Sequence, residues 1–321
     1  MNSLVEIAGA INRAKKVLVS GHVMPDGDSL GSVLAMGLVL KSLGKQVTMA
    51  GPDRVPAVYE FLPGAKDFQV VPPAAGDFDT FITLDCSVPE RLGKGFTEII
   101  SQEIIAINID HHAGSTSFGH YRYIDPLAAA TGEILFDLFD LMKIELTQDV
   151  AVCLYTAIST DTGSFQYEST TSLTHRRVAR LIEAGVPVAE INALIHEEKP
   201  LAALRLLGAA LSTLRLSDCG RAAWMTVTRE DMNKIGADDE HADGLVNYAR
   251  SVMGVEIGIL FRELVPGKYK LSFRSKGSVD VNRLASVFGG GGHRRAAGCV
   301  LEGVFDDLQK RVISESLKSL R

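Results

Sequence analysis

The chain has 321 residues, with 33 lysine and arginine residues against 39 aspartate and glutamate residues and a formal net charge of -6. This length predicts about two domains, and the apolar and charged fractions are those of an ordinary globular protein. The acidic balance argues against a protein that grips long DNA or RNA through its phosphates, although bound divalent cations could still attract a small anionic substrate.

The first half of the chain alternates strands with helices, and the short apolar strands run directly into polar residues. This alternation predicts an α/β fold with a doubly wound, mostly parallel sheet. The Pro/Ala/Gly-rich stretch 71–77 is predicted to be a surface loop. The predicted elements are a helix at 4–14, a strand at 17–20, a helix at 29–43, strands at 46–50, 79–84, 104–109 and 122–124, and helices at 128–143 and 147–159.

After Asp161 the pattern becomes nearly continuous helix over 171–215, and a new α/β unit begins at Gly220. In this unit we predict a strand at 221–227, a helix at 241–251, strands at 254–264 and 268–275, a helix at 280–288, a loop of four glycines and a strand at 296–301. We therefore expect a first domain at 1–187, a helical connector at 188–215 and a smaller α/β domain at 216–321, with the active site in the cleft between the domains.

The four cysteines are widely spaced and form no CxxC pair, which is typical of buried thiols in a reducing compartment rather than of disulfides or a zinc knuckle. The segment MNSLVEIAGAINRAKK predicts a short amphipathic helix rather than a signal peptide, and no apolar run is long enough to span a bilayer. These features predict a cytoplasmic protein that does not contact membranes.

Aspartate and histidine residues gather in four segments, and three of these follow or end predicted strands. The segments are HVMPDGD at 22–28, ITLD at 82–85, NIDHH at 108–112 and STDTGSF at 159–165. Because the carboxyl ends of parallel strands meet at one sheet edge, we expect these side chains to lie together, although Asp28 alone could also be the N-cap of a helix that begins at Ser29. No segment contains lysine or arginine, so metal ions are the obvious compensation for the buried carboxylates.

The ligand chemistry favours particular metals. Several carboxylates with one or two imidazoles and no thiolate favour manganese or magnesium, with zinc or cobalt possible. Five or six ligands exceed the needs of one ion, and a pair of ions bridged by a carboxylate and a hydroxide is the usual arrangement for hydrolysing phosphate esters.

The four motifs, in this order, resemble those of the DHH phosphoesterases, which are named for the triplet at 110–112. The resemblance covers the whole N-terminal domain and implies a role for each residue. His22 and Asp26 would hold one metal ion, and Asp85 would bridge the two ions. The second ion would be held by Asp28, His111 and Asp161. His112 would face the scissile phosphate as a charge stabiliser or proton donor, and Asp110 would orient its neighbours.

The segment FRSKGSVDVNRLASVFGGGGHRRAAG at 273–298 is a second concentration of unusual residues. Four consecutive glycines let the backbone approach a ligand and present N–H groups to an anion, although a mobile loop with solvated arginines would have the same composition. The segment resembles the DHHA1 domain that accompanies many DHH phosphoesterases and whose GGGH motif contacts substrate. The resemblance implies that the substrate is bound by Arg274, Ser275, Gly291, Gly292 and His293.

Within this family, a chain of this length resembles the small nano-RNase (oligoribonuclease) and pAp phosphatase type. The resemblance implies hydrolysis of very short oligonucleotides and linear dinucleotides to mononucleotides by a hydroxide that two metal ions activate. It also implies removal of the 3′-phosphate from 3′-phosphoadenosine 5′-phosphate. The expected cofactors are two Mn²⁺ ions, with Mg²⁺ or Co²⁺ as alternatives, and a homodimer is expected only from the resemblance.

Several alternatives stay open. A cyclic-dinucleotide (c-di-AMP) phosphodiesterase would share all of these motifs. A RecJ-like single-strand exonuclease usually carries additional nucleic-acid-binding domains. A manganese pyrophosphatase shares the first domain but not a second domain of the GGGH type, so His293 argues against it. A non-catalytic nucleotide sensor would be favoured by a missing metal ligand, and none is missing.

Overall fold

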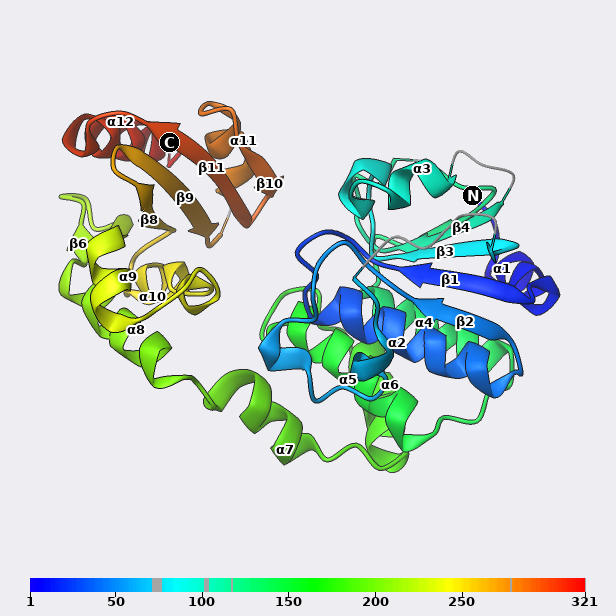
Figure 1. Cartoon of the computed structure of the whole chain (residues 1–321). Helices are drawn as coiled ribbons and strands as arrows, with labels where there is room; N and C mark the ends of the chain where they lie inside the picture. Colours follow the sequence, from blue (N-terminus) through cyan, green and yellow to red (C-terminus); the bar gives the residue numbers. More distant parts are fainter. Residues whose placement is uncertain (71–76, 101–103, 117, 278, 321) are drawn as a thin grey trace. The chain divides into compact units, whose positions relative to one another are not determined.

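The structure is a computed structural model that describes residues 1–70, 77–100, 104–116, 118–277 and 279–320. The chain divides into two compact units, Met1–Glu197 and Glu198–Arg321, and each unit is built around its own sheet (Figure 1). Residues 71–76 of the predicted surface loop lie outside the described residues. No helix in the described part of the chain is long and apolar enough to cross a membrane.

The sheet of the first unit has five strands, all parallel, in the order β2-β1-β3-β4-β5. This arrangement confirms the predicted α/β fold with a parallel sheet. The register pairs Ser20 with Thr83 and Leu84 with Ile109, so β1, β3 and β4 end side by side. The strands are β1 (Lys16–Ser20), β2 (Gln46–Met49), β3 (Thr80–Leu84), β4 (Ile105–Asp110) and β5 (Tyr121–Ile124).

Helices cover both faces of this sheet because alternate strand residues point to opposite sides. Val17 and Ile82 belong to the larger core beneath α2, α4 and α5, whereas Leu18 and Phe81 pack with Phe96 of α3 in a smaller core. The helices are α1 (Leu4–Arg13), α2 (Gly27–Ser42), α3 (Phe96–Ile100), α4 (Thr131–Leu141), α5 (Gln148–Asp161), α6 (Ser172–Glu183) and α7 (Val188–Asn192), with 3-10 turns at Ala57–Tyr59, Ala65–Asp67 and Pro89–Leu92 and a π turn at Ala193–Glu197.

Two helix boundaries near the candidate ligands differ from the sequence prediction. Helix α2 begins at Gly27 rather than at Ser29, because the side chain of Asp26 is the N-cap and accepts a hydrogen bond from the Ser29 N–H at 3.0 Å. Asp28 therefore lies in the first helical turn. Helix α5 includes Asp161 as its last residue instead of ending before it.

The second unit has a mixed six-stranded sheet in the order β10-β11-β9-β8-β7-β6, in which only the β7–β8 pair is parallel among the described strands. The predicted loop of four glycines is partly strand, because β10 begins at Gly291. The elements are α8 (Leu201–Ser212), β6 (Arg215–Leu216), β7 (Ala222–Val227), α9 (Arg229–Ile235), a 3-10 turn (Glu240–Ala242), α10 (Val246–Ser251), β8 (Ile257–Val265), β9 (Lys268–Ser275), α11 (Val281–Ser286), β10 (Gly291–His293), β11 (Ala296–Glu302) and α12 (Phe305–Lys318).

Candidate metal centre

Three adjacent parallel strands deliver candidate ligands to one edge of the first sheet. His22 follows β1, Asp85 follows β3 directly, and β4 ends at Asp110 with His111 and His112 next in the chain. Asp85 has a φ of 55°, in the left-handed region that a residue with a side chain rarely adopts. Such a conformation at a strand end is typical of functional sites, where the surrounding structure holds the residue in place.

Helices α2 and α5 bring the remaining acidic residues to the same edge. A Cβ atom at Gly31 would lie 2.5 Å from the backbone oxygen of Cys153, and one at Gly27 would lie 2.4 Å from Oγ1 of Thr160. The two helices therefore pack closely only because these residues are glycines. This packing places Asp28, in the first turn of α2, beside Asp161 at the end of α5.

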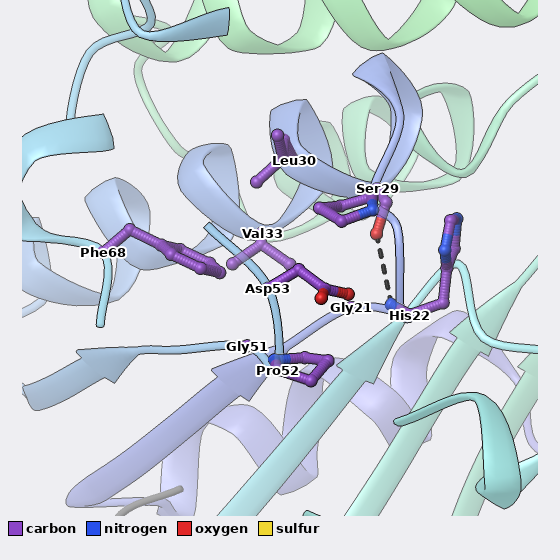
Figure 2. Close-up of a pocket in the computed structure, with 10 residues that line it drawn as sticks. Gly21, His22, Ser29, Leu30, Val33, Gly51, Pro52, Asp53 and Phe68 are labelled. Atoms are coloured by element: carbon purple, nitrogen blue, oxygen red, sulfur yellow. Dashed lines mark hydrogen bonds between the residues drawn. The ribbon is translucent and has the colours of Figure 1, made fainter. Parts of the chain in front are cut away.

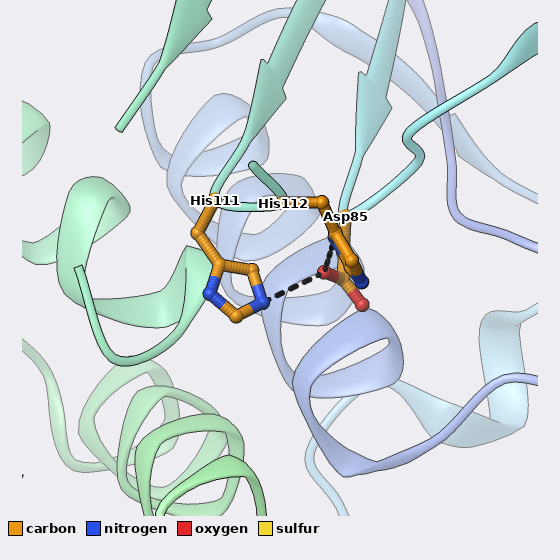
Figure 3. Close-up of side chains that lie close together, drawn as sticks. All are labelled: Asp85, His111 and His112. Carbon is orange, nitrogen blue, oxygen red and sulfur yellow. Dashed lines mark ion pairs between the residues drawn. The ribbon is translucent and has the colours of Figure 1, made fainter. Parts of the chain in front are cut away.

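The predicted ligands form three overlapping groups, and within each group the candidate ligand atoms all lie within 4.8 Å of one another. The first group is His22, Asp26 and Asp85, the second is Asp28, His111 and Asp161, and the third is Asp85, His111 and His112 (Figure 3). The structure thus brings together all six predicted metal ligands and His112.

Asp85 lies between the first two groups, and its two carboxylate oxygens face different histidines. Its Oδ2 atom lies 3.3 Å from Nε2 of His22, whereas its Oδ1 atom lies 3.6 Å from Nε2 of His111 and 3.5 Å from Nδ1 of His112 (Figure 3). A carboxylate with this orientation is suited to bridging two cations.

The imidazole rings of His22 and His111 are oriented by backbone carbonyls. Nδ1 of His22 lies 2.7 Å from the Val23 oxygen, and Nδ1 of His111 lies 3.2 Å from the Ala128 oxygen. If Nδ1 carries the proton, each ring donates it to the carbonyl and turns Nε2 toward the carboxylates. This pairing is the usual environment of a metal-binding histidine.

Burial and neighbouring negative charges raise the pKa values of three carboxylates in the site. Burial, followed by the charges of Asp28 and Asp26, raises the pKa of Asp85 well above its ordinary value, and burial likewise raises the pKa of Asp28. Burial and the neighbouring Asp28 raise the pKa of Asp161 to about 8. Burial alone would lower the pKa of His111, but the surrounding carboxylates raise it to about 9.

Among the described residues, every ion pair that these carboxylates form comes from a histidine. The buried carboxylates of Asp28 and Asp85 have no lysine or arginine partner, and together with the imidazole nitrogens they form a donor set that suits a divalent cation. The residues therefore fit a metal centre, as the sequence predicted.

Asp110, the first residue of the triplet, belongs to none of these ligand groups. Its side chain is completely buried, and its Oδ1 atom accepts hydrogen bonds from the His111 N–H at 2.8 Å and from Nδ1 of His112 at 2.7 Å. Burial alone would raise the pKa of Asp110, but the hydrogen bond and charge of His112 outweigh it and lower that pKa. Asp110 is therefore held as a carboxylate that orients the ring of His112 and holds the backbone of His111.

Two contacts of the site were missed by the sequence analysis. The side-chain hydroxyl of Thr131, at the start of α4, donates to Oδ1 of Asp85 at 3.2 Å. Asp53 lines a small recess beside His22 (Figure 2), and its Oδ2 atom accepts a hydrogen bond at 2.6 Å from the N–H of Met24, which has a φ of 51°. Thr131 lies in the first turn of the helix predicted at 128–143, which is a usable signal, whereas nothing in the sequence marks Asp53.

The five predicted substrate-binding residues lie on β9 and β10 of the second unit. Arg274 is half-buried on β9, while Ser275 is buried and its hydroxyl donates to the Val279 oxygen at 2.8 Å. Gly291 and His293 pair with β11, and a Cβ atom at Gly292, where φ is 147°, would lie 2.5 Å from the Ala296 oxygen. Gly292 thus has a structural reason in the close pairing of β10 with β11, and the binding roles of all five residues stay predictions.

Comparison with known proteins identifies the chain. The N-terminal domain of the DHH family matches residues 16–158, and the DHHA1 domain matches residues 217–318. A protein of Thermus thermophilus called bifunctional oligoribonuclease and PAP phosphatase NrnA is 35% identical over 303 residues, which cover 92% of this chain and 88% of that protein. The chain belongs to the DHH family. It is an enzyme that hydrolyses phosphoester bonds, as the motifs predicted.

Three further proteins resemble this DHH protein in sequence or in fold. A Bacillus subtilis protein with the same name is 25% identical over 301 residues, which cover 91% of each chain. The crystal structure of an exopolyphosphatase-related protein from Bacteroides fragilis covers 99% of this chain and 95% of that chain, with 27% identity and a TM-score of 0.91. A RecJ structure from Thermus thermophilus in complex with Mn²⁺ has a TM-score of 0.56 at 14% identity and covers 98% of this chain and 55% of that chain, so it supports the fold alone.

Proposed function

We propose that this DHH protein hydrolyses very short oligonucleotides and linear dinucleotides to mononucleotides and removes the 3′-phosphate from 3′-phosphoadenosine 5′-phosphate. The observation that carries the proposal is Asp85, whose two oxygens face His22 on one side and His111 on the other. This arrangement supports a two-cation centre for phosphoester hydrolysis. The names of the Thermus and Bacillus relatives support the choice of substrates.

In this proposal His22, Asp26 and Asp85 would hold one divalent cation. Asp28, His111 and Asp161 would hold the second, and the two oxygens of Asp85 would allow it to serve both. The cations are Mn²⁺, with Mg²⁺ or Co²⁺ as substitutes, because carboxylates with imidazoles and no thiolate are their preferred donors. When bound, such a pair supplies positive charge to the phosphate and lowers the pKa of water.

The remaining chemistry belongs to His112 and Asp110. We infer that Asp110 keeps His112 in one orientation through the 2.7 Å contact to Nδ1. The opposite ring nitrogen, Nε2, then donates a proton to the oxygen that leaves phosphorus, or stabilises the charge that develops on the phosphoryl group. Asp110 stays ionised throughout and offsets the positive charge of the imidazolium.

The second unit would select short substrates. Arg274, Gly291, Gly292 and His293 would bind a terminal phosphate or nucleotide, and Ser275 would contribute by fixing the end of β9 through its bond to Val279. The net charge of -6 fits a substrate with few phosphates, because long single strands usually require a positively charged groove.

The test is turnover with Mn²⁺ on a matched panel of compounds. The panel contains linear pApA and pGpG, a five-nucleotide RNA, cyclic di-AMP, 3′-phosphoadenosine 5′-phosphate and pyrophosphate. We expect rapid cleavage of the linear dinucleotides and slower cleavage of the five-nucleotide RNA, together with release of phosphate from 3′-phosphoadenosine 5′-phosphate. The His112→Asn variant, assayed in parallel, should lose activity on every compound that the wild type cleaves.

Two results would overturn the substrate assignment. Fastest cleavage of cyclic di-AMP would make the protein a cyclic-dinucleotide phosphodiesterase with the same metal centre. Absence of turnover on the whole panel by the Mn²⁺-loaded protein would reject all of these substrates.

A further inference from the structure

We propose that Thr131 is a positioning residue of the metal centre, which fixes one oxygen of Asp28 and one oxygen of Asp85 as the atoms that bind the second cation. This inference rests on the two-cation centre of the proposed function, but not on the identity of the substrate. The first turn of α4 hydrogen-bonds to both carboxylates. Its backbone N–H groups at Thr131 and Gly132 donate to Asp28, and the Thr131 hydroxyl donates to Asp85.

The carboxylate of Asp28 is held by three donors that divide unequally between its oxygens. Its Oδ1 atom accepts from the Gly132 N–H at 2.9 Å and from the Ser32 hydroxyl at 3.2 Å, whereas its Oδ2 atom accepts from the Thr131 N–H at 2.7 Å. A carboxylate oxygen offers two acceptor positions, so Oδ1 is fully used and Oδ2 has one position left. Asp28 should therefore bind a cation through Oδ2 alone.

The Thr131 hydroxyl likewise contacts one particular oxygen of Asp85. Its Oγ1 atom donates to Oδ1 of Asp85 at 3.2 Å, and Oδ1 is the oxygen that lies 3.6 Å from Nε2 of His111. The Oδ2 atom of Asp28 lies 3.8 Å from the same Nε2 atom. Thr131 thus contacts the two oxygens that face His111, and its own side chain is completely buried.

The position of Thr131 is itself rigidly determined. The first N–H groups of a helix have no partner within the helix and carry partial positive charge, so they suit a buried carboxylate. Next to Thr131, a Cβ atom at Gly132 would lie 2.7 Å from Cβ of Ala157, so α4 packs closely on α5. Two residues before Thr131, the Ala129 N–H donates to Oε2 of Glu133 at 3.0 Å. These contacts keep the donors of Thr131 at fixed distances from both aspartates.

The variants that test this role separate the hydroxyl from the bulk of the side chain. Thr131→Val has nearly the same shape and keeps the backbone N–H but lacks the hydroxyl, whereas Thr131→Ser keeps the hydroxyl. Thr156→Val is the matched control, because Thr156 is also completely buried and its Oγ1 atom has no hydrogen-bond partner among the described residues. Calorimetric titration of each metal-free full-length protein with Mn²⁺ measures binding without any substrate, and the visible spectrum of the Co²⁺-loaded protein reports the ligand geometry.

We expect Thr131→Val to weaken the binding of one Mn²⁺ equivalent by about 10- to 100-fold and to change the Co²⁺ spectrum, as the loss of a group that orients a metal ligand typically does. Thr131→Ser and Thr156→Val should match the wild type in both measurements. If Thr131→Val does not fold, Thr131→Ala compared with Thr131→Ser carries the same test.

Wild-type Mn²⁺ affinity and an unchanged Co²⁺ spectrum in Thr131→Val would overturn the proposal. An equal loss in Thr131→Ser or in Thr156→Val would also overturn it, because the effect would then follow from packing rather than from the hydroxyl. Failure of the substrate panel together with this pattern of Mn²⁺ binding would reject the proposed substrates and leave the role of Thr131 standing.

Discussion

Oδ1 of Asp110 lies 2.7 Å from Nδ1 of His112, and both residues belong to the triplet at the end of β4. Asp110 is completely buried, so this contact holds the His112 ring without placing a second charge in front of the substrate. Asp110 therefore orients the imidazole ring, whereas His112 is the residue that would face the phosphate.

The first prediction follows from this pair. Asp110→Asn should lower kcat on a linear dinucleotide by about 10- to 100-fold, because the ring of His112 loses its charged acceptor. His112→Asn should lower kcat further, by about 100- to 10,000-fold, as expected for loss of a group that transfers a proton. Mn²⁺ stoichiometry should stay unchanged in both variants. Equal loss in the two variants with reduced Mn²⁺ binding would contradict the assignment of His112 to the substrate.

The second prediction concerns Asp85 and Asp26. Asp85 belongs to ligand groups on both sides of the centre, whereas Asp26 belongs to one group and its side chain is 55% exposed. Asp85→Asn should therefore weaken both Mn²⁺ equivalents, and Asp26→Asn should weaken only one. Calorimetric titration of the metal-free proteins measures the two stoichiometries, and retention of one tight equivalent by Asp85→Asn would argue against a bridging role.

The third prediction tests the close packing of α2 on α5. A Cβ atom at Gly31 would lie 2.5 Å from the Cys153 backbone oxygen, which cannot move without shifting the helix. Gly31→Ala should lower the free energy of unfolding by about 1–3 kcal/mol, as overpacking of a core typically does. Gly208, inside α8, has open space around its Cα, so the control Gly208→Ala should raise that free energy by about 0.5–1 kcal/mol. Urea unfolding measures both, and a neutral Gly31→Ala would show that the helices separate easily.

The fourth prediction concerns pH and Asp79, which joins β1 to β3. Its carboxylate accepts hydrogen bonds from the Lys16 N–H at 2.8 Å, the Thr80 hydroxyl at 2.8 Å and the Lys15 N–H at 3.1 Å. Burial alone would raise the pKa of Asp79, but these hydrogen bonds outweigh it and lower that pKa below its ordinary value. The folded state therefore favours the ionised carboxylate.

A lowered pKa in the folded state means that the stabilisation is present above the unfolded pKa of about 3.9 and is lost as the pH falls through the folded pKa. The free energy of unfolding of Asp79→Ala should be about 1 kcal/mol below that of the wild type at pH 7, a value reduced for solvent exposure, and this difference should shrink below about pH 4. The control Asp77→Ala should match the wild type at both pH values. A difference for Asp79→Ala that is the same at pH 3 and pH 7 would refute the role of the ionised carboxylate.

The residue pattern predicted where the candidate ligands would gather, and the described residues do gather at that sheet edge. Aspartate and histidine at the ends of short apolar runs indicate a sheet edge with metal ligands, because strand alternation and parallel pairing are set by local patterns. His22, Asp85 and His111 could be placed together in this way. The motif order then indicated the DHH family, which the comparisons confirmed.

The residues that support the candidate ligands could not be found without the packing of distant segments. Thr131 and Asp28 are 103 residues apart in the chain, and their hydrogen bond depends on how α4 and α2 pack against each other on one face of the sheet. The strand formed by Gly291 also depends on another segment, because it exists only through its pairing with β11. A local sequence pattern specifies which side chains a segment carries. The distances between side chains of distant segments are set by the packing of several segments together, so no local pattern predicts them.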